Sequence, residues 1–237
     1  LLLIVTPYLA DANNGNWRTA QRWARFLQAR YRVIVQANAS GAAARDAACM
    51  IALHARRSHP AVLEWLAPGS ARPLIVALTG TDLYRDLPEG NAEARASLEL
   101  AGALIVLQED ALVYLSAIHR GKATVVLQSA RALTPALKPA TRLNCAMVGH
   151  LRAEKDPLTA LDAWRLLPAT EPIHLRHIGG MLDAELGAAA RAFMAVERRY
   201  RWLGAMAHGA TRQAIRRAHL LLVPSLIWGP VVLALYA

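Results

Sequence analysis

Two cations lie three residues apart in a glycine turn between an apolar run and a helix-like segment. Arg152 and Lys155 follow Gly149, which ends the apolar run Asn144–Val148, and they precede the helix-like segment Leu158–Leu167. The first turn of a helix has unpaired N–H groups that attract an anion. An arginine fork beside a lysine point charge suits a diphosphate better than a single carboxylate. The spacing therefore predicts a diphosphate site, with a solvated strand-to-helix loop as the alternative.

A second group of polar residues follows the third apolar run of the chain. It contains His54, Arg56, Arg57 and His59. The guanidinium groups could hold a phosphate-like substrate, and either histidine could titrate near neutral pH. The alternative is a solvated loop in which His54 is hydrogen-bonded in place.

A third group follows the fourth apolar run. Gly80 permits a tight turn, and Thr79, Thr81 and Asp82 supply hydroxyl groups and a carboxylate beside it. Asp82 is a candidate general base or acceptor for a sugar hydroxyl. It could instead cap the following turn, which is a common role for Asp at that place.

Small residues mark two further turns. Gly15 and Asn16, before the helix-like segment Trp17–Ala29, could let backbone N–H groups approach an anion, or could form a plain turn. Gly179–Gly180 could likewise admit a nucleotide base or phosphate, or form a bare turn. The stretch Asn13–Asn16 lacks the glycine spacing of a dinucleotide site, and the chain has no nucleophile elbow, phosphate-loop lysine motif or zinc-binding His/Glu motif. We therefore expect no metal and no bound cofactor.

Short apolar runs alternate with helix-like segments, which predicts parallel sheets covered by helices on both faces. In the first half, strands are expected at Leu1–Thr6, Arg32–Gln36, Met50–His54, Leu74–Leu78, Ala103–Leu107 and Thr124–Leu127, and helices at Trp17–Ala29, Pro60–Leu66, Ala92–Leu100 and Asp110–Ile118. After a proline-containing linker, Ala130–Arg142, the second half is expected to contain Asn144–Val148, Leu158–Leu167, Ile173–Ile178, Asp183–Val196, Arg201–Leu203, Thr211–Ala218 and Leu220–Val223. Two doubly wound halves bind ligands outside the carboxyl ends of their strands.

The charge composition narrows the class of partner. The chain of 237 residues has 27 Lys and Arg against 17 Asp and Glu, a net charge of +10. Such an excess suits an anionic partner: nucleic acid, a phosphorylated substrate or a membrane surface. The positive charges are dispersed arginines without a Lys/Arg block or an aromatic-interleaved basic stripe, so nucleic acid is not expected.

Cysteine usage and hydropathy bear on the compartment. Cys49 and Cys145 lie far apart beside apolar runs, as expected for free thiols in a reducing compartment. No charged region precedes Leu1–Val5, so no signal peptide is predicted, and we expect a cytoplasmic protein. The uncharged stretch Leu220–Ala237 reaches the length of a membrane span, but two prolines and a glycine interrupt it. No stable membrane insertion is therefore expected.

Taken together, these residues resemble glycosyltransferases of the GT-B fold and the family 4 type, and more closely the selenosugar synthases of selenoneine biosynthesis. The resemblance rests on Asn14–Asn16, Leu53–Pro60 (LHARRSHP), Ala77–Leu87 (ALTGTDLYRDL), Gly149–Pro157 and Tyr200–Gly204 (YRWLG). It implies an α/β chain with two Rossmann-like doubly wound domains facing across a cleft. Residues 1–137 would form the acceptor domain, and residues 138–237 would form an incomplete nucleotide-sugar domain.

The resemblance implies a reaction that joins selenophosphate to the anomeric carbon of a UDP-sugar, with UDP-N-acetylglucosamine as the expected donor. In the family, an Arg and a Lys bind the donor diphosphate, and Arg152 and Lys155 fall on those positions. Gly15 and Asn16 are expected to assist them. On the acceptor side we expect Arg56, Arg57, His59, Thr79, Gly80 and Thr81 to bind the substrate, with Asp82 and His54 as candidate catalytic residues.

The sequence departs from the family pattern after Ser225. The family continues with Glu-Gly-Gly and a second glutamate that engage donor hydroxyls, whereas no glutamate follows Ser225 here. A truncated or frame-disrupted product is therefore expected. The alternatives are a family 4 glycosyltransferase acting on a hydroxyl acceptor, an inactive nucleotide-binding fragment, and a basic membrane-associated protein.

Overall fold

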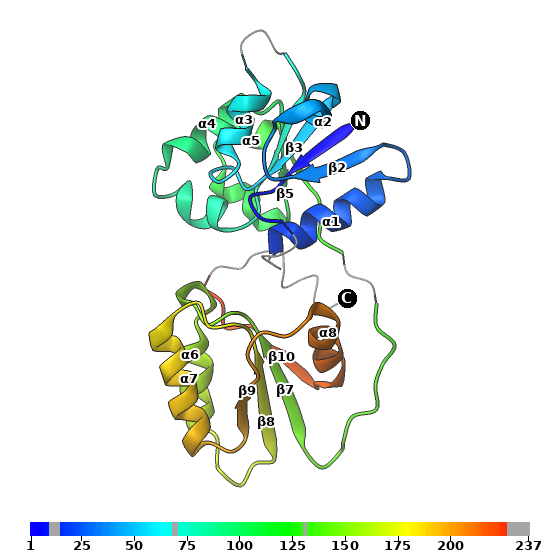
Figure 1. Ribbon diagram of the computed structural model, residues 1–237. Helices are drawn as coiled ribbons and strands as arrows, with labels where there is room; N and C mark the ends of the chain where they lie inside the picture. Colours follow the sequence, from blue (N-terminus) through cyan, green and yellow to red (C-terminus); the bar gives the residue numbers. More distant parts are fainter. Residues whose placement is uncertain (10–14, 68–70, 130–131, 227–237) are drawn as a thin grey trace. The chain divides into compact units, whose positions relative to one another are not determined.

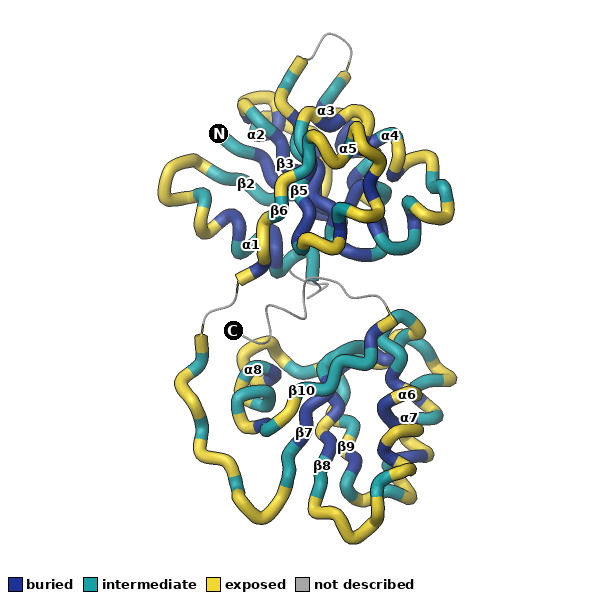
Figure 2. Tube along the Cα trace, turned by 180° about the vertical axis from the view of Figure 1, so that it is seen from behind, coloured by how far each residue is buried: buried dark blue, intermediate teal, exposed yellow. Residues whose placement is uncertain are grey.

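The computed structural model describes residues 1–9, 15–67, 71–129 and 132–226 (Figure 1). These residues divide into two compact units, one ending at Ser129 and the other comprising residues 132–226. Each unit contains one parallel sheet, of six strands in the first and four in the second. The exposed chain at residues 132–142 belongs to the second unit (Figure 2).

The first unit is a doubly wound α/β layer structure. Its elements are β1 (Leu2–Val5), α1 (Gly15–Leu27), β2 (Val33–Gln36), α2 (Gly41–Asp46), β3 (Cys49–Leu53), α3 (His59–Trp65), β4 (Leu74–Ala77), a π-helical turn (Asp82–Asp86), α4 (Ala92–Leu100), β5 (Ala103–Val106), a 3-10 helix (Glu109–Tyr114), α5 (Ala117–Gly121) and β6 (Ala123–Val125). The strand order is β2-β1-β3-β4-β5-β6. The chain therefore reverses its direction of winding between β1 and β3.

Alternate residues of these strands enter two different cores. Ile4 and Ile51 pack with Trp23 of α1 on one face of the sheet. Leu3 and Met50 belong to the other cluster, which includes residues of α3 and α4. Because both faces are buried, each strand is a continuous apolar run rather than an alternating pattern.

The second unit repeats the architecture with fewer strands in the described residues. Its elements are β7 (Leu143–Val148), a 3-10 turn (Ala153–Lys155), α6 (Pro157–Arg165), β8 (Ile173–Ile178), α7 (Ala184–Val196), β9 (Tyr200–Trp202), α8 (His208–Arg217) and β10 (Leu220–Leu222). The strand order is β10-β7-β8-β9. Residues of α6 and α7 pack against one face of this sheet in a single hydrophobic cluster, and α8 lies on the other side (Figure 1).

Most predicted strands and helices are present within a residue or two of the expected bounds. The expected helix Asp110–Ile118 is wrong, because the chain there forms a 3-10 helix, Glu109–Tyr114, followed by the short α5. The short α2 was not predicted, because six residues rich in alanine carry no periodic pattern. Among the described residues, no helix is both long enough and apolar enough to cross a membrane. The departure from the family pattern expected after Ser225 lies almost entirely in residues 227–237, which are outside the described residues. Asn13 and Asn14 are also outside the described residues.

Candidate functional site

The β7 loop, residues 149–156, follows β7 and lies where the winding of the second sheet reverses. From β7 the chain adds β8 and β9 on one side and then β10 on the other side. Ligands of doubly wound sheets bind outside the carboxyl ends of the strands at such a reversal. The backbone N–H of Leu226, after β10, donates to the carbonyl oxygen of Glu154 over 3.2 Å. The predicted diphosphate loop is therefore held at the β7–β10 switch point.

Two glycines let the loops after β7 and β8 meet. Gly149 N–H donates to Ile178 O at 2.9 Å, and Leu151 N–H donates to Gly180 O at 2.9 Å. A Cβ atom at Gly179 would lie 1.8 Å from the carbonyl oxygen of Gly149. Only glycine fits there, so Gly179 serves the close approach of two backbones.

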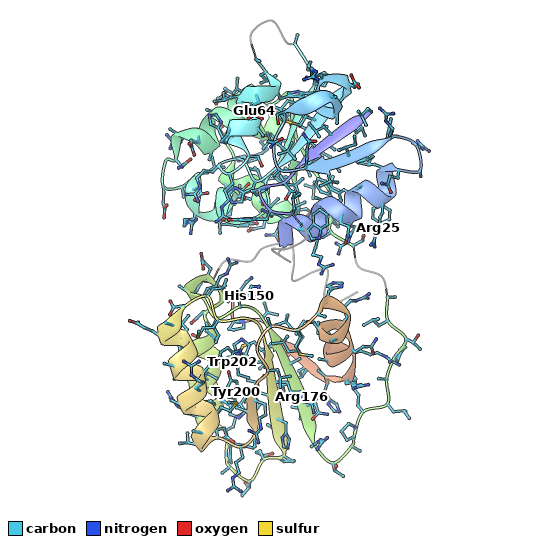
Figure 3. All side chains as sticks on the ribbon, viewed as in Figure 1. Arg25, Glu64, His150, Arg176, Tyr200 and Trp202 are labelled. Carbon is cyan, nitrogen blue, oxygen red and sulfur yellow. The ribbon has the colours of Figure 1, made fainter. Side chains whose placement is uncertain are left out.

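A buried histidine fixes the carbonyl of Gly149. His177 Nδ1 is 3.0 Å from the hydroxyl of Tyr200, and its Nε2 is 3.0 Å from Gly149 O. A carbonyl can only accept, so His177 Nε2 carries the proton and Nδ1 accepts from the Tyr200 hydroxyl. Burial lowers the pKa of His177 and raises that of Tyr200, which keeps both neutral. Trp202 Nε1 donates to Gly179 O at 2.9 Å, so β9 supports both turns (Figure 3).

His150 is a candidate ligand-binding residue that the sequence reasoning did not single out. Its Nδ1 accepts from the backbone N–H of Gly180 at 2.9 Å, which leaves the proton on Nε2. The His150 side chain is labelled in Figure 3. Burial, and then the charges of Arg152 and Lys155, lower the pKa of His150. The imidazole is therefore a neutral donor beside two cations. The sequence feature that could have indicated a role for His150 is its position directly after Gly149, the first residue beyond β7.

Arg152 and Lys155 carry positive charge that the loop compensates only in part. Burial, and then the charge of Arg152, lower the pKa of the Lys155 ammonium group. No residue in the described part of the chain pairs with that ammonium group, although its stem packs over Gly149. Arg152 Nε is buried, makes no hydrogen bond to the described residues, and lies 3.7 Å from Glu154 Oε2. An anion bound here would relieve the repulsion between the two cations.

The start of α6 already has a carboxylate. Asp156 is its N-cap residue, with φ +41°, and it accepts from Thr159 N–H at 3.5 Å and from Thr159 Oγ1 at 2.6 Å. Our expectation that the first turn of this helix attracts the anion is therefore weakened. The cationic side chains of the β7 loop, rather than the start of the helix, are therefore the candidates for that role.

In the first unit, the groups after β3 and β4 form one hydrogen-bonded network. Asp82 is fully buried, and its carboxylate accepts from the backbone N–H groups of Ala55 at 2.9 Å, Thr79 at 3.0 Å and Gly80 at 2.8 Å. His54, 2% exposed, lies 3.0 Å from Thr81 Oγ1 through Nε2. The predicted grouping of these two loops at one sheet edge therefore corresponds to direct contacts.

The bonds of His54 also define its protonation. Its Nδ1 accepts from the backbone N–H of Arg57 at 3.3 Å, so the proton is on Nε2. Burial lowers the pKa of His54, although the charge of Asp82 opposes this shift. In this geometry His54 and Asp82 position the loops, because their acceptor atoms face backbone N–H groups. Their catalytic roles stay predictions.

The predicted acceptor-binding residues Arg56, His59 and Arg57 differ in what they contact. Arg56 Nε pairs with the buried Asp86 at 3.1 Å. His59 Nδ1 donates to Ser97 Oγ at 2.9 Å, because that hydroxyl donates its own proton to a backbone carbonyl. The Arg57 guanidinium instead lies over the ring of Tyr8, 5.2 Å from its centroid, at the switch between β1 and β3. Arg57 is exposed, whereas Arg56 and His59 are partly buried.

Gly15 and Asn16 are the first two residues of α1, and the chain immediately before them lies outside the described residues. Among the described residues, no group of three or more His, Cys, Asp or Glu side chains is arranged to hold a metal ion.

Comparisons with known proteins identify the fold. No protein-family model matches the chain, and no curated protein matches it. A glycosyltransferase from Rickettsia africae ESF-5 superposes with a TM-score of 0.65 at 11% identity, over 95% of this chain and 73% of that one. HepE from Anabaena, in complex with UDP and glucose, gives 0.62 at 14% identity, over 97% and 75%. S. aureus TarM in complex with UDP gives 0.59 at 11% identity, over 78% of this chain but only 39% of that one.

These structures share an α/β architecture with this chain. The chain has the GT-B fold, with Rossmann-like parallel sheets, and the fold class predicted from the sequence is confirmed. The chain spans about two fifths of the length of TarM and about three quarters of the other two proteins.

Proposed function

We propose that this chain belongs to a glycosyltransferase that takes a UDP-sugar as its donor. The observation that supports this is the β7 loop, in which Lys155 and Arg152 lie beside the neutral donor His150 at a sheet switch point. Structures of HepE, which has the same fold, contain UDP or UDP-glucose. Residues 1–137 would bind the acceptor, and residues 138–237 would bind the donor.

The chemistry of a UDP-sugar donor would explain why two cations, Arg152 and Lys155, lie in this loop. When the bond between the anomeric carbon and the UDP oxygen breaks, the diphosphate gains negative charge. A cation about 4 Å from that charge stabilises it by about 4 kcal/mol at an effective dielectric constant near 20. Arg152 and Lys155 could supply this stabilisation, and the Nε2–H of His150 could donate to a phosphate oxygen. Gly15 and Asn16 of α1 remain candidates to approach the same diphosphate.

We propose selenophosphate as the acceptor. Its selenium atom is already anionic, so it can attack the anomeric carbon without a general base while UDP leaves. The intermediate would then lose phosphate by reaction with water, which leaves the selenosugar. The buried Asp82 and His54, whose acceptor atoms are occupied, suit a reaction without a strong base. Arg57, with Thr79, Gly80 and Thr81 nearby in the fold, would meet the phosphate group, while Arg56 and His59 would hold the loop in place.

We also propose a cytoplasmic location, which rests on the two cysteines. Cys49 and Cys145 are both free thiols, and burial raises the pKa of each. Protonated thiols, of which Cys145 is buried and Cys49 is partly buried, suit a reducing compartment.

Donor binding is tested by calorimetry with UDP. We expect Lys155→Met to weaken UDP binding about tenfold or more, because it removes a charge-assisted contact. Its thermal stability should be unchanged or higher, because the substitution removes an unpaired cation. The control is Arg217→Gln, an exposed arginine in the last turn of α8, which precedes the amino end of β10 and is remote from the loop. No heat of binding with wild-type protein, or equal affinity for wild type and Lys155→Met, would contradict the donor assignment.

The acceptor is tested by UDP release from UDP-N-acetylglucosamine. Release that depends on selenophosphate supports the selenosugar reaction, whereas release that depends only on glycerol or a sugar supports transfer to a hydroxyl. Arg57→Gln should raise the apparent KM for selenophosphate with the KM for the UDP-sugar unchanged. Arg32→Gln, an exposed arginine of the same unit, is the matched control. An unchanged KM for selenophosphate in Arg57→Gln would remove that residue from the acceptor site.

A further inference from the structure

A shallow cavity in the second unit is lined mainly by arginines. It has a volume of about 140 Å³ and lies at the amino ends of β7, β8 and β9. Its basic lining consists of Arg142, His174, Arg176, Arg198, Arg199 and Arg201. The β7 loop with Lys155 follows the carboxyl end of the same sheet. The cavity is therefore a separate place in the fold.

Strand register places like charges next to each other there. Arg176 of β8 is the direct partner of Arg201 of β9, and both side chains are exposed (Figure 3 labels Arg176). On the same face, His174 is the partner of Asn144 in β7. Like charges in directly opposite positions of neighbouring strands destabilise a sheet. This arrangement has a cost that a bound anion would offset.

Of the five arginines that line the cavity, only Arg199 has its charge compensated by another of the described residues. Arg199 forms a two-pronged ion pair with Glu197, at 2.8 and 3.0 Å, and donates to the carbonyl oxygen of Pro168 at 2.7 Å. No described residue forms an ion pair or hydrogen bond with the guanidinium groups of the other four. Elsewhere in this unit, by contrast, Arg165 pairs with Asp162 at 2.6 Å.

The shape and chemistry favour a particular class of anion. A guanidinium group binds phosphate through two parallel N–H···O bonds, and several of them around one hollow suit several phosphate groups. The cavity, with a volume of about 140 Å³, leaves space for phosphate oxygens beside these guanidinium groups. We propose that this cavity is a second anion site, which binds a soluble oligophosphate with two or more phosphate groups. The site does not depend on the proposed glycosyl transfer.

The test is calorimetric titration of the chain with tripolyphosphate. We expect Arg176→Gln/Arg201→Gln to bind tripolyphosphate at least about tenfold more weakly than wild type, because two charge-assisted contacts are lost. Both side chains are exposed, so circular dichroism should be unchanged. The control is Arg30→Gln/Arg32→Gln, which removes the same charge from two exposed arginines that belong to the first unit and do not line the cavity. Equal weakening in both double variants would show a general charge effect and overturn the proposal.

Two further arms separate the cavity from other anion sites. Arg152→Gln/Lys155→Gln should bind tripolyphosphate more tightly than Arg176→Gln/Arg201→Gln does. If the loop variant alone abolishes binding, the ligand occupies the β7 loop and the proposal is wrong. Sedimentation with phosphatidylglycerol vesicles tests a membrane source of phosphate. Binding that occurs to vesicles and not to tripolyphosphate would also overturn the proposal.

Discussion

Replacing Gly179 with alanine tests whether the β7 loop is positioned by backbone contact. The new Cβ atom would lie 1.8 Å from Gly149 O, 2.4 Å from Gly149 C and 2.8 Å from His150 N. All three are backbone atoms, so no side-chain rotation relieves the overlap. An ordinary contact begins at 3.4 Å, and the loops would have to separate by about 1.6 Å.

That separation breaks the bonds that define the site. The bonds from His177 Nε2 to Gly149 O, at 3.0 Å, and from Leu151 N–H to Gly180 O, at 2.9 Å, would both exceed the hydrogen-bonding range. Overpacking costs about 1–3 kcal/mol, and each lost bond about 0.5–1.5 kcal/mol net. We therefore expect Gly179→Ala to lose about 2–6 kcal/mol of unfolding free energy. UDP affinity should fall by about tenfold or more, because His150, Arg152 and Lys155 move with the loop.

Urea denaturation and hydrogen exchange of the β8 amides measure the effect within the second unit. Two alanine substitutions serve as controls. At Gly187 the new Cβ would lie 2.3 Å from Met181 Sδ, but that side chain is flexible and 48% exposed, so we expect a small change. At Gly209, in α8, nothing lies within 4 Å, and alanine should stabilise the helix by up to about 1 kcal/mol. If Gly179→Ala is as stable and binds UDP as tightly as Gly209→Ala, the backbone contact does not position the loop.

Three other measurements address charge and burial. Asp82→Asn should cost about 2–4 kcal/mol of stability in urea, because an amide oxygen cannot replace a carboxylate that accepts three backbone N–H bonds; lost turnover with unchanged stability would instead show a catalytic base. His54 and His177 have pKa values lowered by burial, so their contribution is fully present above the unfolded pKa of 6.5 and is lost as pH falls toward the folded values. Between pH 6.5 and 5.5 each should reduce stability by up to about 1 kcal/mol, and His177→Gln should flatten that dependence, which urea titrations at both pH values will show or refute. Arg72 donates to the carbonyl at the end of α2 over 2.6 Å and lies 3.3 Å from the Trp65 ring centroid. Arg72→Gln should cost about 1–3 kcal/mol and Arg72→Lys less, and equal melting curves for all three proteins would argue against this clamp.

The strands and their carboxyl-end loops could be predicted because parallel strands buried on both faces are continuous apolar runs. The loops of His54 and Asp82 were expected at one sheet edge for the same reason. Their hydrogen bonds could not be predicted. A sequence does not show that Asp82 accepts three backbone N–H groups, since those belong to the folded path of the turn.

The residues that support the β7 loop could not be predicted from the sequence either. His177 lies within a strand, 28 residues from the carbonyl that it holds, and Tyr200 is a further 23 residues away. Nothing local distinguishes such a histidine from a polar interruption of an apolar run. The arginine-lined cavity could not be predicted for a similar reason, because only the register between β8 and β9 brings Arg176 beside Arg201.

The strand orders have a consequence for synthesis of the chain. The first strand made in each unit, β1 or β7, lies inside its sheet, with neighbours on both sides. The second edge of β1 is covered once β3 emerges, but that of β7 waits for β10, at Leu220–Leu222. During translation β7 therefore keeps an apolar edge open over most of the second unit, and an uncovered edge is a site of mispairing with other chains. The first unit can close early, whereas the second depends on nearly the last residues described.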